Sequence, residues 1–444
     1  MKSLLLFLCT FSPLLTSHAE PPKKSGSAAS EKSSRADGLL TLADVTPAVL
    51  ERNPAIREAR AKWEAMKQRV PQAAAWDDLK VSASTRLARF VDVATNSFTD
   101  QMLSVEQMIP ISGKNQSRAR IAAAEALGAL EEVRRKELDV IGKARAAFFR
   151  LAKGYALLEL LRANESSLHQ TLDITRARLE VGGQSQAEVL TAQNEVARLG
   201  EARRDLQRGV SADATQLKVL MNRDPFLPLG RPAVAGAHAA LPPVGRLRTL
   251  LLSNRPEVRM AEAGVTAAKA KLELAKREWI PDPALSIGVQ RYNGASQAAS
   301  EVTAGISFNV PWLNARKYRA GEDEAQRGLE AAEHALEGAR TEALGMLRDQ
   351  LQKIETFHHH VELFETGLIP NAREILQTNR TNYEGGKTGF LELVLSERSM
   401  RDLESKAREH FADYQVAVAE LETLVGADLH FFSPRTETSK RISK

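Results

Sequence analysis

The chain repeats one arrangement of segments about 200 residues further along. Three landmarks recur in the same order, at offsets of 202, 201 and 204 residues. The matched pairs are ERNPAIREA (51–59) with SNRPEVRMA (253–261), VEQMIPISGKNQSRAR (105–120) with ISFNVPWLNARKYRA (306–320), and LEVGGQSQAEVLTAQ (179–193) with YEGGKTGFLELVLSE (383–397). Self-similarity at a fixed period is the signature of a repeated supersecondary unit. We therefore predict two copies of one unit, at 39–230 and 246–430, joined by a linker at 231–245.

Each copy is predicted to contain a helix, two strands and a long helix with a break. The strands are expected from the alternation of apolar and polar residues. They lie at about 79–91 and 100–109 in the first copy, and at about 283–292 and 300–310 in the second. Strands of about ten residues are long enough to cross a bilayer at a tilt. The fold class is therefore mainly α with a small β part.

Four strands alone cannot close into a barrel, and lipid does not tolerate an open sheet edge. Two interpretations remain open at this point: a soluble sheet whose edges are covered, or a barrel to which several chains each contribute four transmembrane strands. No segment after the N-terminal region holds 18 apolar residues without a charge. Contact with a membrane would therefore have to be made by the strands.

The helical segments are long and carry coiled-coil spacing. No proline occurs between Ser112 and Val181, and some seventy helical residues would span about 100 Å. Apolar residues in this stretch follow steps of four and three, which is the spacing of a coiled-coil seam. The predicted seams are Ala144, Phe148, Leu151, Tyr155 and Leu158 in the first copy, and Leu347, Leu351, Ile354, His358 and Val361 in the second. A helix of this length either bridges two distant places or packs side by side with other long helices to form a wall.

The N-terminus reads as an export signal. Residues 1–19 combine Lys2, an apolar stretch and the small residues Ser17 and Ala19 before a cleavage point at Glu20. Cys9, the only cysteine, lies among large apolar residues, so no lipid anchor is predicted, and the mature chain has no thiol for metal binding or nucleophilic chemistry. The polar segment 20–38 is predicted to be a flexible leader and 431–444 a polar tail.

Composition and motifs argue against an enzyme and against a nucleic-acid partner. The net charge of +5 comes from 61 basic and 56 acidic residues with no block of five like charges, a pattern typical of solvated helices. No phosphate-binding loop, zinc spacing or hydrolase motif occurs. The tract His358–His360 is not predicted to bind metal, because consecutive helical residues face different directions. Asp77 and Asp78 have no nucleophile or base near them in sequence. We expect no cofactor and no metal site.

The doubled plan, the ERNP and SNRPE segments, the QMIPISGK segment and the LEVGG and YEGG breaks together resemble the outer-membrane efflux proteins of the TolC type. The resemblance covers the chain from about Leu39 to Leu429, and QMIPISGK and PDPALSIGV are most similar to the CzcC-like branch that serves heavy-metal pumps. It implies a homotrimer whose twelve strands form one barrel in outer-membrane lipid. A long coiled-coil helical barrel would extend from it into the periplasm.

The resemblance also assigns a role to the two breaks, as the periplasmic tips of helical hairpins that meet a periplasmic membrane-fusion adaptor protein. The implied contact residues are Leu179, Val181, Gly182, Gly183, Ser185, Tyr383, Gly385, Gly386 and Thr388. Glu188 and Glu392 are gate candidates, because threefold symmetry would turn Glu392 into a ring of three carboxylates. Leu395 stands where a second acid can occur in the family. A plain interhelical turn and ordinary solvated glutamates are the alternatives.

The function implied is that of the outer-membrane channel in a tripartite efflux system, fed by the adaptor and by an inner-membrane pump of the proton-driven RND type. Heavy-metal cations are the favoured cargo on the branch resemblance. Two alternatives stay open: a channel for drug efflux or type I secretion, and a periplasmic coiled-coil scaffold without a pore.

Overall fold

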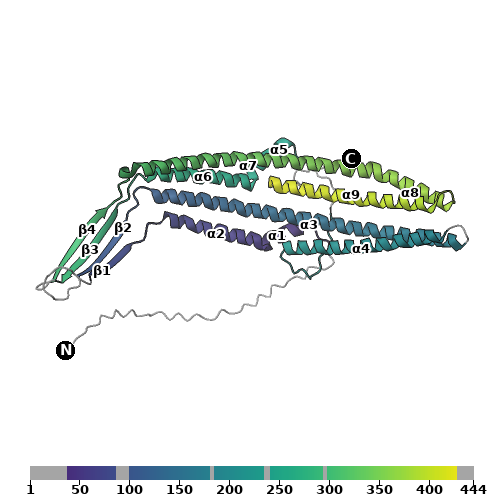
Figure 1. Cartoon of the computed structure of the whole chain (residues 1–444), viewed down its shortest axis with the longest axis horizontal. Coiled ribbons are helices and arrows are strands. Elements are labelled where there is room, and N and C mark those ends of the chain that lie inside the picture. Colours follow the sequence, from purple (N-terminus) through teal and green to yellow (C-terminus); the bar gives the residue numbers. More distant parts are fainter. Residues whose placement is uncertain (1–37, 87–99, 181–184, 235–240, 294–297, 428–444) are drawn as a thin grey trace, which may run out of the picture.

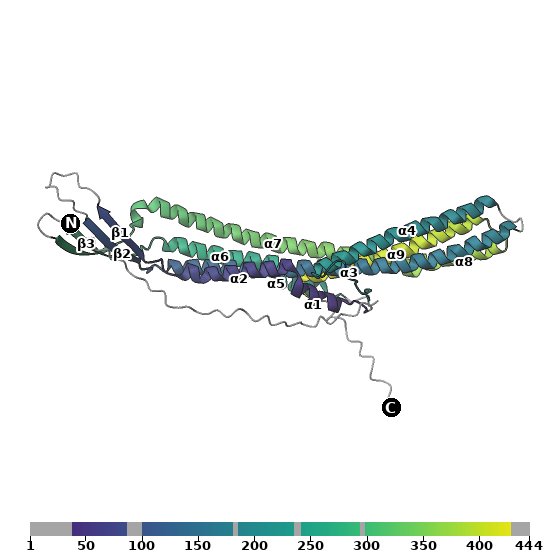
Figure 2. The same cartoon turned by 90° about the horizontal axis from the view of Figure 1, so that it is seen from below.

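The computed structural model describes residues 38–86, 100–180, 185–234, 241–293 and 298–427. It shows an elongated molecule with a small sheet at one end and long helices running away from it (Figures 1 and 2). The predicted signal peptide, all but the last residue of the leader, and the polar tail lie outside these residues. The mainly helical fold with a small β part is confirmed.

The two halves follow the same order of elements. The first half contains α1 (Leu42–Arg52), α2 (Pro54–Ala74), β1 (Lys80–Arg86), β2 (Asp100–Met108), α3 (Lys114–Glu180) and α4 (Gln186–Leu220). The second half contains α5 (Val244–Asn254), α6 (Pro256–Arg277), β3 (Ala284–Asn293), β4 (Ala298–Ser307), the 3₁₀ helix η1 (Pro311–Asn314), α7 (Ala315–Leu363), the π-helical turn η2 (Phe364–Leu368), α8 (Ile369–Glu384) and α9 (Phe390–Val425).

The repeated ERNP and SNRP segments lie between the first two helices of each half, α1 and α2 or α5 and α6. Each segment also bonds to the end of the last helix of its half, α4 or α9. Asn53 caps α2, since its Oδ1 accepts a hydrogen bond from Ala55 N at 2.9 Å, and Pro54 takes the first helical position. Asn53 Nδ2 also donates to Leu220 O, at the end of α4. Arg255 occupies the equivalent position in the second half and donates to Leu424 O, near the end of α9. The residue before the proline thus satisfies a terminal helix carbonyl in each half.

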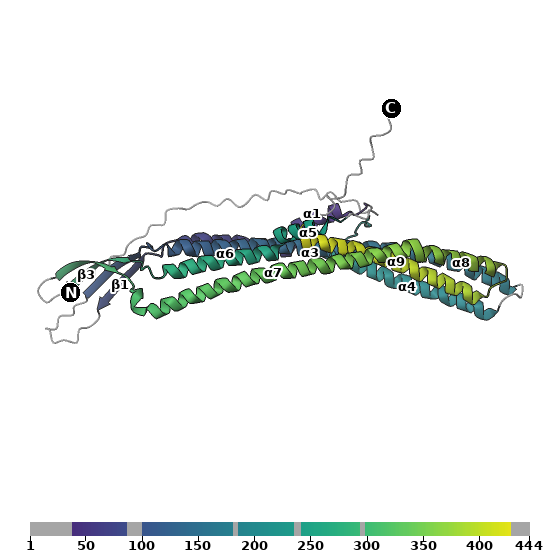
Figure 3. The ribbon, with the colours of Figure 1, turned by 90° about the horizontal axis from the view of Figure 1, so that it is seen from above.

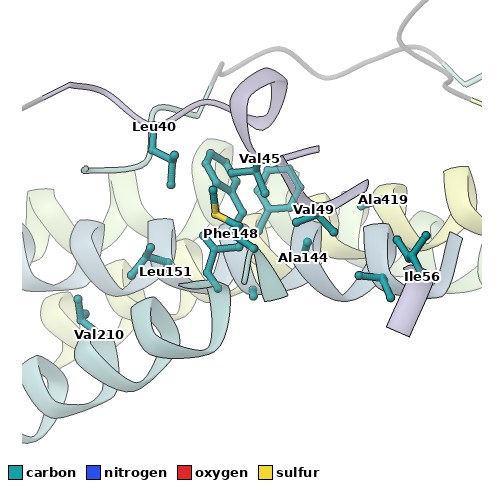
Figure 4. Close-up of a cluster of buried hydrophobic side chains, with 14 of the residues drawn as sticks. Leu40, Val45, Val49, Ile56, Ala144, Phe148, Leu151, Val210 and Ala419 are labelled. Atoms are coloured by element: carbon teal, nitrogen blue, oxygen red, sulfur yellow. The ribbon is translucent and has the colours of Figure 1, made fainter. Parts of the chain in front are cut away.

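The described helices bury three apolar clusters: one centred in each half, and a third at the far end that joins both halves. In the first half, Val45 and Val49 of the short helix α1 share one cluster with Phe148 and Leu151 of α3 (Figure 4). In the second half, Leu247 and Leu251 of α5 join residues of α7 and α9. Coiled-coil seam positions Ala144, Phe148, Leu151, Leu158, Leu347, Ile354 and Val361 are buried as predicted. His358 is exposed instead, with its ring against Tyr414 at the edge of the contact between α7 and α9.

The helical run of the second half contains an irregularity that the first lacks. Pro370 follows η2 and cannot donate a backbone hydrogen bond, and its ring would crowd the carbonyl of Thr366 in a regular helix. The wider π-helical turn over Phe364–Leu368 precedes it, and Thr366 Oγ1 donates to Glu362 O at 2.7 Å. The run therefore continues to Glu384 despite the proline.

The sheet is antiparallel throughout, in the order β1-β2-β3-β4. Its central pair joins the two halves, with Leu103 opposite Val289 and Val105 opposite Ile287. β4 ends at Ser307, before the predicted 310, because Ser307 pairs with Ala284, the first residue of β3. The predicted extension of β1 to 91 lies outside the described residues.

One face of the sheet is apolar and uncovered. The cross-strand register places these residues on it: Val81, Ala83, Leu103, Val105, Leu285, Ile287, Val289, Val302, Ala304 and Ile306. Val302 is 70% exposed and Val81 63%. Among the described residues, no helix packs on this face, and neither β1 nor β4 pairs along its outer edge. The interpretation as a soluble sheet with covered edges is therefore not supported within the described chain.

The helices themselves do not supply a membrane segment. Within the described part of the chain, no helix is both long and apolar enough to span a bilayer.

The close approach of α3 and α4 gives a test of the hairpin. A Cβ added at Gly154 would lie 2.6 Å from Val210 Cγ2, and the stiff, branched valine cannot turn aside. We expect Gly154→Ala to destabilise the protein by about 1–3 kcal/mol through overpacking, measured as a lower thermal unfolding midpoint of the detergent-purified chain. Gly128→Ala, also in α3, is the control: its Cβ meets no atom within 4 Å, so stability should stay equal or rise. Equal midpoints for the two variants would contradict this packing.

Candidate functional site at the paired hairpin tips

Two helix reversals lie at the end of the molecule opposite the sheet. The first separates α3, which ends at Glu180, from α4, which begins at Gln186, and the second separates α8, ending at Glu384, from α9, beginning at Phe390. Figures 1 and 3 show both at the same end. We call these reversals, with the first two turns of the helices on either side, the hairpin tips. Val181, Gly182 and Gly183 lie outside the described residues.

The second tip is a tight turn that requires glycine. Gly385 N donates to Thr381 O and Lys387 N donates to Asn382 O, which satisfies carbonyls at the end of α8. Gly386 has φ of +71°, in the left-handed region that glycine adopts without steric cost. The glycine pattern in the sequence is thus explained by local backbone geometry.

Tyr383 ties this tip to the first hairpin from inside. Its side chain is only 1% exposed, its hydroxyl lies 3.2 Å from Thr175 Oγ1 of α3, and its ring packs near Phe390. The guanidinium of Arg178 lies 4.5 Å from the ring centre and donates to Glu384 O. A buried ring cannot present a surface to another protein, so an adaptor contact through the Tyr383 side chain is not supported.

The other predicted contact residues that the structure describes are accessible to differing degrees. Ser185, Gly385 and Gly386 are exposed, whereas Leu179 and Thr388 are half-buried, with Leu179 packed on the apolar cluster of the tips. Sequence reasoning gave no contact role to three exposed leucines in the first turns beyond the reversals. They are Leu190 of α4 and Leu391 and Leu395 of α9, which are 51%, 66% and 51% exposed. They make the surface of the tips partly apolar.

The two gate candidates occupy equivalent places. Glu188 and Glu392 each stand at the third position of the helix that follows the reversal. A carboxylate there is favoured by the partial positive charge of a helix N-terminus. Glu392 is exposed and Glu188 half-buried. This interaction with the helix N-terminus is enough to explain an acid at both positions, without a ring of carboxylates in a trimer.

A charged cluster joins the two hairpins behind the tips. Glu195 of α4, 6% exposed at the side chain, accepts hydrogen bonds from Arg398 of α9, at Oε2 from Nε and at Oε1 from Nη2. Arg401 Nη2 lies 3.6 Å from the same Oε2. Thr171 of α3 donates to Glu397 of α9 at 3.0 Å. Sequence reasoning missed this cluster. The sequence does contain a sign of it, because one acid interrupts each apolar seam. Glu195 lies between Ala192 and Leu199, and Glu397 lies between Leu393 and Met400.

The surroundings shift the pKa values of the two acids in opposite directions. The hydrogen bonds from Arg398, with the positive charges of Arg398, Arg198 and Arg401, hold the pKa of Glu195 below its ordinary value despite its burial. Burial raises the pKa of Glu397, and the hydrogen bond from Thr171 only partly offsets this.

The repeat and the paired tips suggest that the chain is related to a known protein family, and comparison with family models identifies that family. The model for outer membrane efflux proteins matches residues 45–223 and again 247–427, one match in each half. The chain belongs to the outer membrane efflux protein family. The resemblance drawn from the sequence is confirmed, and so is the likeness to the heavy-metal branch, since resistance proteins for nickel, cobalt and cadmium are among the relatives.

The relatives are similar at low identity. The nickel-cobalt-cadmium resistance protein NccC of Alcaligenes xylosoxydans xylosoxydans is 23% identical over 56% of this chain, and the match spans 56% of its own length. The solvent efflux pump outer membrane protein SrpC of Pseudomonas putida is 24% identical over 81% of this chain and 79% of its own.

Solved structures share the fold. CusC, which forms a transmembrane channel, superposes with a TM-score of 0.76 at 18% identity, covering 87% of this chain and 92% of CusC. The outer membrane protein VceC of Vibrio cholerae gives 0.72 at 18% identity, covering 87% and 96%. SrpC is thus named as part of an efflux pump, and CusC as a transmembrane channel.

The ion pairs behind the tips predict a pH-dependent stability. Glu195→Gln should lower the free energy of unfolding by about 1–3 kcal/mol at pH 7, the size of hydrogen bonds to charged groups. Because the folded-state pKa of Glu195 lies below the unfolded one, its stabilisation is present above the unfolded pKa and is lost as the pH falls through the folded value.

The difference between the variant and the wild type should therefore shrink as the pH falls below about 4.3, the ordinary pKa of glutamate. Thermal melts at several pH values would measure it. The control is Glu201→Gln, an exposed position of the same helix, which should change little at any pH. A pH-independent difference at Glu195 would exclude the charge as its cause.

Proposed function

We propose that this chain is the outer-membrane channel of a tripartite efflux system and works as a homotrimer. One observation carries the proposal: the chain belongs to this family, and in the described part of it the sheet has one uncovered apolar face and two unpaired outer edges. Exposed apolar area of this extent needs a partner or a lipid environment. Free strand edges need another strand.

Three chains resolve both requirements together. If β1 of one chain pairs with β4 of the next, three sheets of four strands close into a twelve-stranded barrel, and every backbone group along the edges is satisfied. The apolar face then lies against outer-membrane lipid. The export signal expected at residues 1–19 is consistent with this location, and no lipid anchor is needed.

The helices lead from the membrane to the partners. At about 1.5 Å per residue the 67 residues of α3 extend about 100 Å, which would carry the tips deep into the periplasm. Two tips in each of three chains form a pseudo-sixfold ring. We propose that a periplasmic membrane-fusion adaptor docks there on Leu179, Val181, Gly182, Gly183, Ser185, Gly385, Gly386 and Thr388, and that the exposed leucines of the tips extend this surface.

An inner-membrane pump, of the proton-driven RND type, would supply the energy of transport. The channel chain then has no chemical step to perform. The cargo we favour is heavy-metal cations, because NccC and the nickel and cobalt resistance protein CnrC are named for them. The relative SrpC is named for solvent efflux and matches more of the chain, which makes organic solvents the second candidate.

A conductance measurement tests the pore itself. The full-length protein, purified in detergent, should have the mass of a trimer and should give discrete current steps after insertion into a planar bilayer. A monomeric mass together with failure to insert would overturn the proposal in favour of a periplasmic scaffold. The exchange Ile287→Asp, on the apolar sheet face, should abolish insertion, whereas Gln290→Asp on the polar face should not.

The gate proposal concerns Glu392. If its three copies ring the pore at the tips, Glu392→Gln should raise the resting conductance and weaken block by multivalent cations, because the carboxylates that attract cations are gone. Single-channel recordings with and without a trivalent cation measure both. Glu374→Gln, an exposed acid of α8 away from the reversals, is the control. If conductance and block are unchanged, Glu392 is only a helix-terminal residue. Glu188→Gln tests the other candidate in the same way.

A further inference from the structure

Two histidines from different helices lie ring against ring beside the π-helical turn η2. His360 belongs to the last turn of α7 and His410 to α9, and their ring centroids are 4.7 Å apart. Phe364, the first residue of η2, has its ring 5.1 Å from that of His410, and Phe357 lies 6.5 Å from His360. The imidazole pair therefore stands in a largely aromatic setting between α7 and α9, apart from the hairpin tips and from the sheet.

Both imidazoles bury a nitrogen that nothing satisfies. The Nδ1 atoms of His360 and His410 are inaccessible to solvent, and neither has a hydrogen-bond partner among the described residues. Buried nitrogen atoms are almost always paired, because an unpaired one loses its hydration without compensation. Because the two unpaired nitrogen atoms belong to adjoining rings, one ligand bound to both explains them more simply than two unrelated unpaired atoms.

The spacing of the rings suits one ion bound to both. A metal–imidazole bond of about 2.1 Å places each ring centre about 3 Å from the ion, so two rings that share an ion at a near-tetrahedral angle lie about 5 Å apart. The observed separation of 4.7 Å falls at this value. A direct hydrogen bond between the rings is not formed.

The charges around the pair are also compatible with a cation. Imidazole binds metal through a neutral ring nitrogen. The negative charges of Glu409 and Asp413 act on the His410 ring against the positive charge of Lys406.

We propose that His360 and His410 form a two-ligand site for a divalent transition-metal cation of the Zn²⁺, Ni²⁺ or Co²⁺ class, which imidazole ligands suit. Among the described residues, no group of three or more His, Cys, Asp or Glu side chains could hold a metal ion. Water would therefore have to enter with the ion to complete the coordination, since the Nδ1 atoms are covered although both histidines are partly exposed. The ion would tie α7 to α9 beside η2. This inference is independent of the proposed channel function.

The site also explains why the histidine tract is not a metal motif by itself. His358 turns its ring toward Tyr414, and the ring centroids of His359 and His360 are 6.4 Å apart. Only His360 meets an imidazole from another helix. The second ligand lies 50 residues away in the chain, on α9.

Zinc binding by the full-length protein tests the proposal. The protein would be purified in detergent without a polyhistidine tag, freed of metal with a chelator, and titrated with Zn²⁺ against a competing chromophoric chelator. We expect one Zn²⁺ per chain. His360→Phe and His410→Phe should each weaken binding at least about tenfold, since even changes beyond the ligands cost that much. His358→Phe and His334→Phe, both at exposed positions of α7, should bind as the wild type does.

A stability measurement separates loss of the site from loss of the fold. The double variant His360→Phe, His410→Phe removes both unpaired imidazole nitrogens, so it should melt at or above the wild-type temperature without metal. Saturating Zn²⁺ should raise the melting temperature of the wild type and not that of the double variant. The proposal is overturned if the wild type binds no Zn²⁺, if the His358→Phe variant loses as much affinity as the His360→Phe variant, or if Zn²⁺ stabilises the double variant equally.

Discussion

The ladder between β2 and β3 is the interaction on which the arrangement of the chain depends. These two strands belong to different repeats, and their pairing sets the two halves side by side with a fixed register, Leu103 opposite Val289 and Val105 opposite Ile287. The long helices that follow β2 and β4, α3 and α7, then both run away from the sheet (Figure 1). Within the described residues, the outer edges of β1 and β4 stay unpaired, and lipid does not tolerate free strand edges.

The helical runs that follow carry this alignment to the far end. The first is continuous from Lys114 to Glu180, and the second reaches from Ala315 to Glu384 through a π-helical turn and a proline. Because the two runs have nearly the same number of residues, both reversals arrive at the same level. Only this equality allows Thr175 to meet Tyr383 and Glu195 to meet Arg398. Contacts at the tips therefore depend on helix lengths set far from them.

Much of the fold and part of the site could be predicted from the sequence, because they rest on local patterns. Alternation at period two marks the strands through residues such as Val302 and Ile306, and steps of three and four mark the seams through Phe148 and Leu151. Gly386 could be assigned to a turn, since only glycine adopts its φ readily. The contact role of Tyr383 could not be judged this way, because burial depends on a partner helix some 200 residues away in the chain.

The sequence by itself determined the doubled unit, the long helices, the apolar alternation of the strands and the breaks between hairpin arms. These features repeat at nearly constant offsets and act between residues close in the chain. Tertiary structure alone decided which side chains of one half meet those of the other. Glu195 and Arg398 occupy positions that do not correspond in the repeat, and His360 and His410 lie on two different helices, α7 and α9. The physical reason is that such contacts depend on the register and length of whole helices, which no local spacing of residues encodes.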